Sequence, residues 1–174
     1  PPRPNGAGVL LLPTIAAIDP YMRAVAAELA GLGYTVVVWD PYGGEQPPAE
    51  TMAQLARSKR IGDKDAMRDL TQAVDCMLGP LALRSVATIG WCLGGRFALL
   101  QGGAEPRLAA VIAYNPTIYS PTPVALYGIP TSRANFPGQT HDEFALAEAI
   151  ACPVQLLRPG NALAQPAEYA RLER

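Results

Sequence analysis

Short apolar runs recur along this chain, and segments with helical spacing separate them. The runs cover residues 8–12, 35–40, 85–91, 108–115 and 152–160. They lack the polar alternation of a sheet with one wet face, so each predicts a strand buried on both faces of a parallel sheet. Parallel neighbours need right-handed crossovers, which place helices on both faces. The pattern therefore predicts a doubly wound α/β fold, a mostly parallel sheet with flanking helices.

Two of the intervening segments carry clear helix signals. The first begins with Asp19 in the capping position and Pro20 at the first helical position, and Gly33 ends it. The second covers 63–79, and its apolar residues fall on one face at helical spacing: Met67, Leu70, Val74 and Met77.

The length of 174 residues suits one domain over 1–174, with an irregular, proline-rich segment near 115–144 that predicts a loop or lid. The net charge of −1 offers no basic field for a nucleic acid. The longest apolar run is broken by Pro13, is too short to span a membrane and lacks a basic flank. We expect a cytoplasmic protein without nucleic-acid or membrane partners.

The three cysteines, Cys76, Cys92 and Cys152, include no C-x-x-C pair, which argues against a disulfide framework and a zinc site. No nucleotide-binding glycine motif is present either, so we expect neither a metal nor a cofactor. Free cysteines are commonly small buried apolar residues, and this interpretation suits Cys76 and Cys152.

Cys92 lies in a different setting, between Gly90 and Gly94, where a predicted strand runs directly into a predicted helix. G-x-C-x-G at this place is the pattern of a nucleophile elbow with cysteine in place of serine. The tight turn leaves no room for side chains two positions away on either side. The pattern favours Cys92 as a nucleophile. The alternative is that the glycines serve only close packing of strand and helix.

An elbow would give this thiol a chemical setting. The helix N-terminus beside the sulfur favours the thiolate, and we expect Cys92 to be the most reactive of the three thiols. The N–H of Leu93 can donate to an oxyanion, and the loop of Thr14 and Ile15 can supply a second donor. The carboxyl ends of parallel strands meet in one crevice. The residues expected to face it are Pro13, Thr14, Ile15, Asp40, Trp91, Cys92, Asn115, Gly160 and Asn161.

In order and spacing, the segments around these residues resemble the dienelactone hydrolase family of the α/β-hydrolase fold. They are GVLLLPTIAAIDPYMRAVAAELAGLGYTVVVWDPY, AVDCM, VATIGWCLGGRFALL, AAVIAYN and CPVQLLRPGNALAQPAEYARL. The resemblance implies a Cys-Asp-His triad, an acyl-enzyme and hydrolysis of a small lactone or ester without metal or cofactor. By position, Cys92 is then the nucleophile, and Leu93 and Ile15 are the oxyanion donors. Thr14, Trp91 and Arg57 are candidates for the substrate pocket, with Arg57 near the place where the family binds a substrate carboxylate.

The chain also departs from the family pattern. Ala162 stands at the position of the triad acid, and Thr14 stands at that of an early glutamate. The only histidine is His141, in the irregular segment, where we expect a solvated loop histidine. The final strand and helix that the family pattern leads us to expect are missing before Arg174. We therefore expect these residues not to be the whole catalytic unit of an active hydrolase.

Three functions follow from these observations. The first is hydrolysis of a small lactone, ester or thioester through Cys92. The alternative is a non-catalytic relative that binds a ligand or partner and has lost the triad acid and base. A third is a thiol sensor or acyl carrier that uses Cys92 without turnover.

Overall fold

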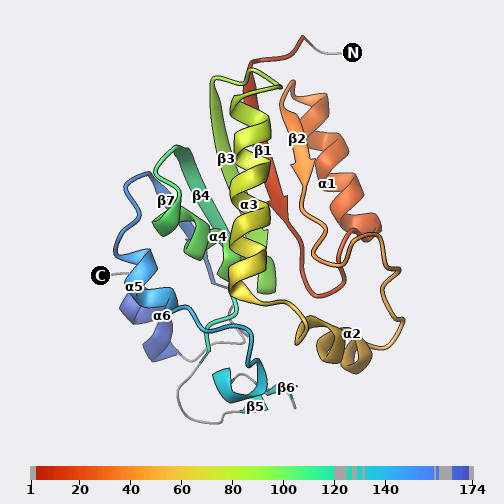
Figure 1. The fold of residues 1–174 in the computed structure, drawn as a ribbon, viewed down its shortest axis with the longest axis vertical. Helices are drawn as coiled ribbons and strands as arrows, with labels where there is room; N and C mark the ends of the chain where they lie inside the picture. The colour runs from red at the N-terminus through yellow and green to blue at the C-terminus, as the bar shows by residue number, and fades with distance from the viewer. Residues whose placement is uncertain are drawn as a thin grey trace.

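The computed structural model describes residues 3–119, 125–126, 129–130, 132–158, 160 and 166–172. Its central feature is a five-stranded sheet in which every neighbouring pair is parallel, with the strand order β2-β1-β3-β4-β7 (Figure 1). The order and direction of the strands confirm the α/β fold predicted from the sequence. The strands are β1 (Ala7–Leu12), β2 (Thr35–Val38), β3 (Ser85–Trp91), β4 (Leu108–Tyr114) and β7 (Val154–Leu157).

Helices follow the strands in the predicted alternation, and all five predicted strand regions contain one strand of this sheet. The helices are α1 (Pro20–Gly31), α2 (Thr51–Ser58), α3 (Asp63–Leu78), α4 (Leu93–Ala104), α5 (Glu143–Ala147) and α6 (Pro166–Leu172). The irregular segment near 115–144 also holds short elements. These are an antiparallel pair, β5 (Ala125–Leu126) with β6 (Ile129–Pro130), and a 3-10 turn, η1 (Arg133–Asn135).

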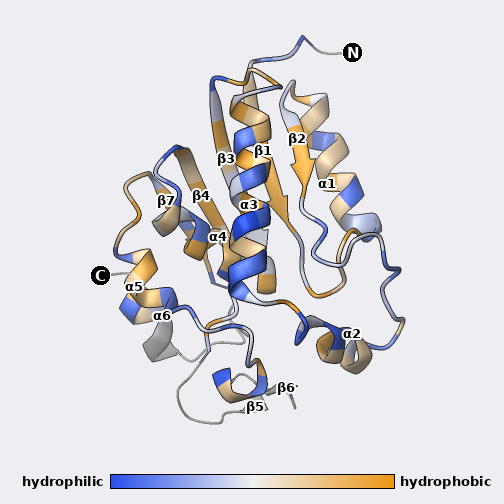
Figure 2. Ribbon diagram, viewed as in Figure 1, coloured by the Kyte–Doolittle hydropathy of each residue, from blue (hydrophilic) through white to orange (hydrophobic). Residues whose placement is uncertain are grey.

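Two apolar layers hold the helices on the sheet. On one face, α3 and α4 pack against alternate strand residues such as Leu10 and Leu12, with Phe97 fully buried. On the other face, α1 packs its Met22 against Val9 and Leu11. The apolar colouring in Figure 2 runs along the strands, and α3 shows a hydrophilic outer side to the viewer.

Local signals in α1 and α3 agree with the structure at most positions. The Asp19 carboxylate accepts a hydrogen bond from the Met22 N–H, and Pro20 begins α1, as predicted. In α3, the predicted apolar face is buried, with Met67 partly so. The burial predicted for Cys76 is wrong, because this thiol is exposed. Two positions after Val74, it points about 200° around the helix from that buried residue.

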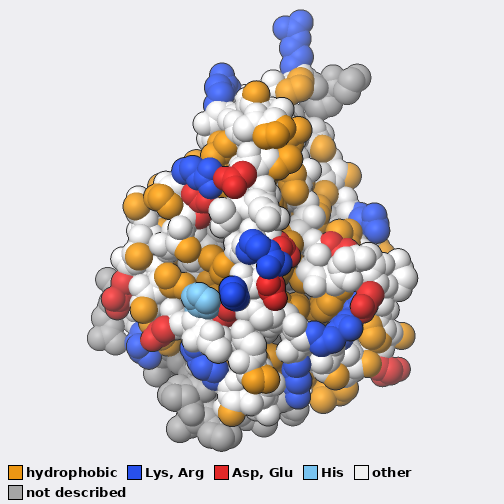
Figure 3. All heavy atoms as spheres, viewed as in Figure 1, with side chains coloured by type: hydrophobic (Ala, Val, Ile, Leu, Met, Phe, Trp, Pro, Cys, Tyr) orange, Lys and Arg blue, Asp and Glu red, His pale blue; other side chains and the backbone are white. Residues whose placement is uncertain are grey.

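The surface charges agree with the small net charge of the sequence. On the face shown in Figure 3, lysine and arginine side chains alternate with aspartate and glutamate and form no extended field of one sign. In the described part of the chain, no helix combines the length and the apolar character needed to cross a membrane.

The strand register brings the carboxyl ends of β1, β3, β4 and β7 to one level. Leu12 of β1 pairs with Gly90 of β3, and Trp91 pairs with Tyr114 of β4, which in turn pairs with Leu157 of β7. In Figure 1 these carboxyl ends point downward, toward α2, α5 and the β5–β6 pair. The residues that follow the four strands are therefore placed side by side.

Candidate functional site

A cavity of about 730 Å³ lies at these strand ends and includes Cys92. Four of its lining residues directly follow the ends of different strands or lie within two residues of them. They are Thr14 after β1, Cys92 after β3, Asn115 after β4 and Arg158 after β7. The rest of the lining comes from Tyr21, Val25, Trp91, Tyr114 and Leu157.

This arrangement confirms that Thr14, Trp91, Cys92 and Asn115 face one cavity. Asp40 does not line it. Its carboxylate instead accepts hydrogen bonds from the Tyr42 and Gly44 N–H groups and closes a turn after β2. Gly160 is also not among the lining residues, and Asn161 and Ala162 lie outside the described residues.

The backbone at Cys92 has the strained geometry of an elbow. Its φ is 53° and its ψ is −112°, a conformation that costs a non-glycine residue free energy. A Cβ atom at Gly90 would lie 2.1 Å from the Gly94 carbonyl oxygen. A Cβ atom at Gly94 would lie 2.0 Å from the Leu12 carbonyl oxygen. Both neighbours are backbone atoms of packed elements, so glycine is required on each side of Cys92.

The sulfur of Cys92 lies among few polar groups. Its Sγ is 3.4 Å from the Thr117 hydroxyl oxygen, and the Leu93 N–H also points to it. Burial raises the pKa of this thiol, and the hydrogen bonds from Thr117 and Leu93 offset only part of that effect. Burial thus opposes the thiolate that the helix N-terminus was expected to favour.

Two backbone N–H groups lie in the segments from which oxyanion donors were predicted. The first is that of Leu93, which begins α4 directly after Cys92. In the turn after β1, the Ala16 and Ala17 N–H groups donate to the hydroxyl and carbonyl of Thr14. The Ile15 N–H has no acceptor among the described residues. Pro13 and Ile15 were both expected to face the cavity, but neither is among its lining residues.

Arg57 does not line this cavity, although the sequence suggested a place in the substrate pocket. Its guanidinium donates to the carbonyl oxygens of Glu45, Gln46 and Ile15, and it stacks on the Tyr42 ring at 3.6 Å. Only 8% of the residue is exposed. Arg57 therefore ties α2 to the turn that carries the Ile15 N–H.

A buried ion-pair cluster lies beside the elbow. Arg96, one turn into α4, binds Asp63 of α3 through two nitrogens and Glu143 of α5 through a third. Arg133 of η1 binds the same Glu143. The Arg96 guanidinium also lies 5.2 Å from the centre of the Tyr119 ring. We name the set of Asp63, Arg96, Arg133, His141 and Glu143 the Arg96 cluster.

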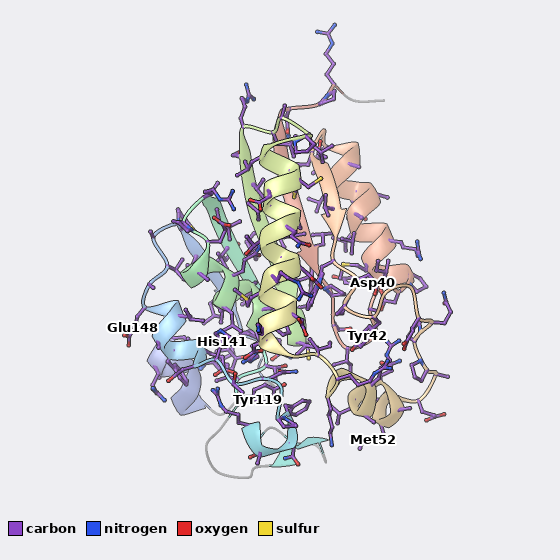
Figure 4. All side chains as sticks on the ribbon, in the orientation of Figure 1. Asp40, Tyr42, Met52, Tyr119, His141 and Glu148 are labelled. Atoms are coloured by element: carbon purple, nitrogen blue, oxygen red, sulfur yellow. The ribbon has the colours of Figure 1, made fainter. Side chains whose placement is uncertain are left out.

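His141 belongs to this cluster and is not a fully solvated loop residue. Its N–H donates to Asp63, and its Nδ1 lies 3.1 Å from the same carboxylate. The side chain remains 41% exposed. In Figure 4, His141 lies beside the lower end of α3 and Tyr119 lies below it, whereas Tyr42 lies on the side of α2. Within the described part of the chain, His141 makes no hydrogen bond to the Cys92 thiol.

Sequence reasoning missed three groups of the site. Thr117 and Arg158 follow strand ends, so the rule that located Asn115 could have found them. Tyr21 could be located only from the structure, because it lies on a helix distant in sequence and packs edge-on against Trp91. Trp91 in turn stacks on Tyr114. Among the described residues, no three or more histidine, cysteine or acidic side chains are grouped so that they could hold a metal ion.

Comparison with known proteins identifies relatives of this chain. The profile of the dienelactone hydrolase family matches residues 1–161. A carboxymethylenebutenolidase from Rhodococcus opacus is 32% identical over 113 residues, which are 63% of this chain and 44% of that protein. A probable 2-oxo-3-(5-oxofuran-2-ylidene)propanoate lactonase from Bradyrhizobium sp. is 29% identical over 53% of this chain and 39% of its own length. Each match thus spans less than half of the relative.

Solved structures share the fold at low sequence identity. An esterase from Pyrococcus furiosus superposes with a TM-score of 0.68 at 20% identity, over 97% of this chain and 68% of that one. A putative dienelactone hydrolase from Klebsiella pneumoniae superposes with a TM-score of 0.62 at 13% identity, over 91% and 75%. These likenesses establish an α/β-hydrolase-like fold.

Proposed function

Because the chain belongs to the dienelactone hydrolase family, we propose that it hydrolyses a small lactone, ester or thioester with Cys92 as the nucleophile. One observation carries the proposal: Cys92 occupies a strained elbow between two obligatory glycines and lines a cavity of about 730 Å³. The named relatives are lactone hydrolases, which supports the same reaction class. Strain of this kind is retained where a reactive group has to be presented.

The reaction follows from the groups around the sulfur. The Cys92 thiol releases its proton to solvent water, and Sγ attacks the substrate carbonyl carbon to form a tetrahedral intermediate. The negative oxygen accepts hydrogen bonds from the Leu93 and Ile15 N–H groups. The C–O or C–S bond then breaks, the released alcohol or thiol takes a proton from solvent water, and an acyl thioester remains on Cys92; in a lactone the alcohol stays attached to the acyl group. Water hydrolyses this thioester and restores the thiol, without a metal or cofactor in any step.

The cavity supports a small, partly apolar substrate. Trp91 and Tyr114 stack with ring centres 5.3 Å apart and form an aromatic wall, and Val25 and Leu157 add apolar surface. Arg158 is the cationic group of the lining. A guanidinium in this position can hold a carboxylate or carbonyl oxygen of the substrate.

The raised pKa of the Cys92 thiol predicts how the rate depends on pH. At neutral pH most of the thiol is protonated, and only the thiolate attacks. Below that pKa, each added pH unit should increase the thiolate fraction about tenfold, so acylation should still be rising above about pH 8.5, the ordinary pKa of cysteine. Burst kinetics with p-nitrophenyl acetate across alkaline pH measure this rise. A plateau already reached at neutral pH would contradict it.

The test of function is turnover of p-nitrophenyl acetate and of a small lactone by the wild type and by Cys92→Ala. We expect Cys92→Ala to lose turnover with both substrates. Cys76→Ala is the matched control, since it removes an exposed thiol distant from the cavity and should retain activity. Turnover that survives Cys92→Ala would refute the proposal. Absence of turnover in the wild type would favour the non-catalytic alternative.

A further inference from the structure

The segment that follows β4 is fixed directly to the elbow. The Cys92 N–H donates to the Tyr114 carbonyl, and the Thr117 N–H donates to the Cys92 carbonyl, both at 2.9 Å. Pro116 lies between them, and its Cα would be 3.0 Å from a Cβ atom at Gly95. The backbone of Thr117 is thus held in register with Cys92 by two hydrogen bonds and by close packing.

This register places a hydroxyl at the sulfur. The Thr117 Oγ1 lies 3.4 Å from the Cys92 Sγ, within the range of a hydrogen bond to sulfur. Threonine is branched at Cβ, so few rotamers are open to it and the hydroxyl loses little freedom by staying there. In the described part of the chain, no other side chain is hydrogen-bonded to this thiol. The hydroxyl oxygen of Thr14, which also lines the cavity, accepts a hydrogen bond from the Ala16 N–H, and this hydroxyl makes no hydrogen bond to the sulfur.

The protonation state of the Cys92 sulfur decides which of the two atoms donates this hydrogen bond. A neutral thiol can donate weakly to the hydroxyl or accept from it, whereas a thiolate can only accept. Once Sγ is ionised, the Thr117 O–H therefore has to donate to it. A hydrogen bond to a charged group is stronger than one between neutral groups, so the contact favours the ionised sulfur.

We propose that Thr117 is a positioning residue for the nucleophile, whose hydroxyl fixes the Cys92 side chain and donates to the sulfur when it ionises. The inference rests on the proposed role of Cys92 and adds to it the group that prepares the thiol. The direction of the effect on the Cys92 pKa agrees, because the bond to Thr117 lowers that pKa against the larger effect of burial. Thr117 thus adds a second hydrogen bond that stabilises the thiolate, beside that of the Leu93 N–H.

The experiment measures the rate of Cys92 alkylation by iodoacetamide against pH, with the adduct located by peptide mass. Thr117→Val keeps the shape of the side chain and removes the hydroxyl, and Thr117→Ser keeps the hydroxyl. We expect Thr117→Val to move the alkylation midpoint to higher pH and to slow alkylation about tenfold at neutral pH. Thr117→Ser should behave like the wild type within about twofold.

Thr88→Val is the matched control. Thr88 is buried in β3, and its hydroxyl donates to the Leu10 carbonyl at the same 3.4 Å, away from the sulfur. This variant should leave the alkylation profile unchanged. The cavity lining also includes the titratable or charged side chains of Arg158, Tyr21 and Tyr114. They are unchanged in every variant, so their effect on the Cys92 pKa is the same throughout the comparison.

Coincident profiles for Thr117→Val and the wild type would overturn the inference, and so would a Thr117→Ser profile shifted as far as that of Thr117→Val. If Thr117→Val does not fold, Thr117→Ala against Thr117→Ser makes the same comparison. Alkylation does not require turnover, so the two proposals fail separately. A shifted profile with turnover that survives Cys92→Ala would remove the proposed function alone.

Discussion

Cys92 and its two glycines show how a single residue position can be fixed by backbone contacts. Any side chain at Gly94 would have to enter the space of the β1 carbonyl of Leu12, which is itself part of the sheet. Neither the Leu12 carbonyl oxygen nor the backbone of Gly94 can move without separating α4 from the sheet. The G-x-C-x-G pattern therefore predicted the elbow from local sterics alone.

A pair of glycine substitutions tests this requirement. Gly94→Ala should lower the free energy of unfolding by at least about 3 kcal/mol, because overpacking here meets rigid backbone. Gly31→Ala is the control. Nothing lies within 4 Å of a Cβ atom at Gly31, near the end of α1, and alanine there should be neutral or stabilising by up to about 1 kcal/mol. Urea unfolding of both variants measures the difference, and equal stabilities would contradict the account of the elbow.

Residues such as Thr117 and Arg96 could not be located from the sequence in the same way. Thr117 meets Cys92 through a contact 25 residues apart, and Arg96 meets Glu143 47 residues away. Arginine is almost never fully buried unless paired, and its partners here lie on other elements. The misplacement of Cys76 has a simpler cause, since the general tendency of free cysteines to be buried was applied without regard to its position on the helix, where it points away from buried Val74.

At the scale of elements, α2 supports the turn after β1 through Arg57. The buried guanidinium binds three backbone carbonyls from two loops, and Ile15 is among them. The sequence placed Arg57 near a substrate carboxylate, because a family pattern gives the neighbourhood of a side chain but not its direction. The contacts of Arg57 instead fix the loop that carries one proposed oxyanion donor.

Substrate charge separates the two interpretations of Arg57. If Arg57 only holds the turn, Arg57→Ala should lower kcat/KM about tenfold or more for p-nitrophenyl acetate and for an ester of equal size that carries a carboxylate, with an unchanged ratio. Arg60→Ala is the control, since Arg60 is exposed and pairs with Glu45, and it should have little effect. A loss confined to the anionic ester would instead place Arg57 at the substrate.

At the scale of the whole molecule, the Arg96 cluster joins α3, α4, η1 and α5 below the strand ends. The fully buried Arg96 side chain balances the carboxylates of Asp63 and Glu143. Removal of one member of a buried pair leaves the partner charge uncompensated, so Arg96→Met should cost about 3–5 kcal/mol of stability. Urea unfolding checks this value, and a loss below about 1 kcal/mol would contradict it.

The Arg96 cluster also predicts an acid limit to stability. Burial raises the pKa of Asp63, but the hydrogen bonds and charge of Arg96 and the His141 N–H outweigh burial and leave that pKa below its ordinary value. The resulting stabilisation is present above the unfolded pKa of about 3.9 and is lost as the pH falls through the folded pKa. The unfolding free energy should therefore fall as the pH drops below about 5, and Asp63→Asn should show a smaller fall. Parallel curves for the two proteins would refute this assignment.

In the proposed reaction, Cys92 carries the acyl group. Quenching the protein in acid during reaction with p-nitrophenyl acetate, followed by intact mass and peptide mapping, tests this role most directly. We expect one acetyl group per chain, located on the peptide of Cys92, removed by hydroxylamine and absent from Cys92→Ala. An acetyl group found instead on Cys76, Cys152 or a hydroxyl side chain, with Cys92 unmodified, would contradict it.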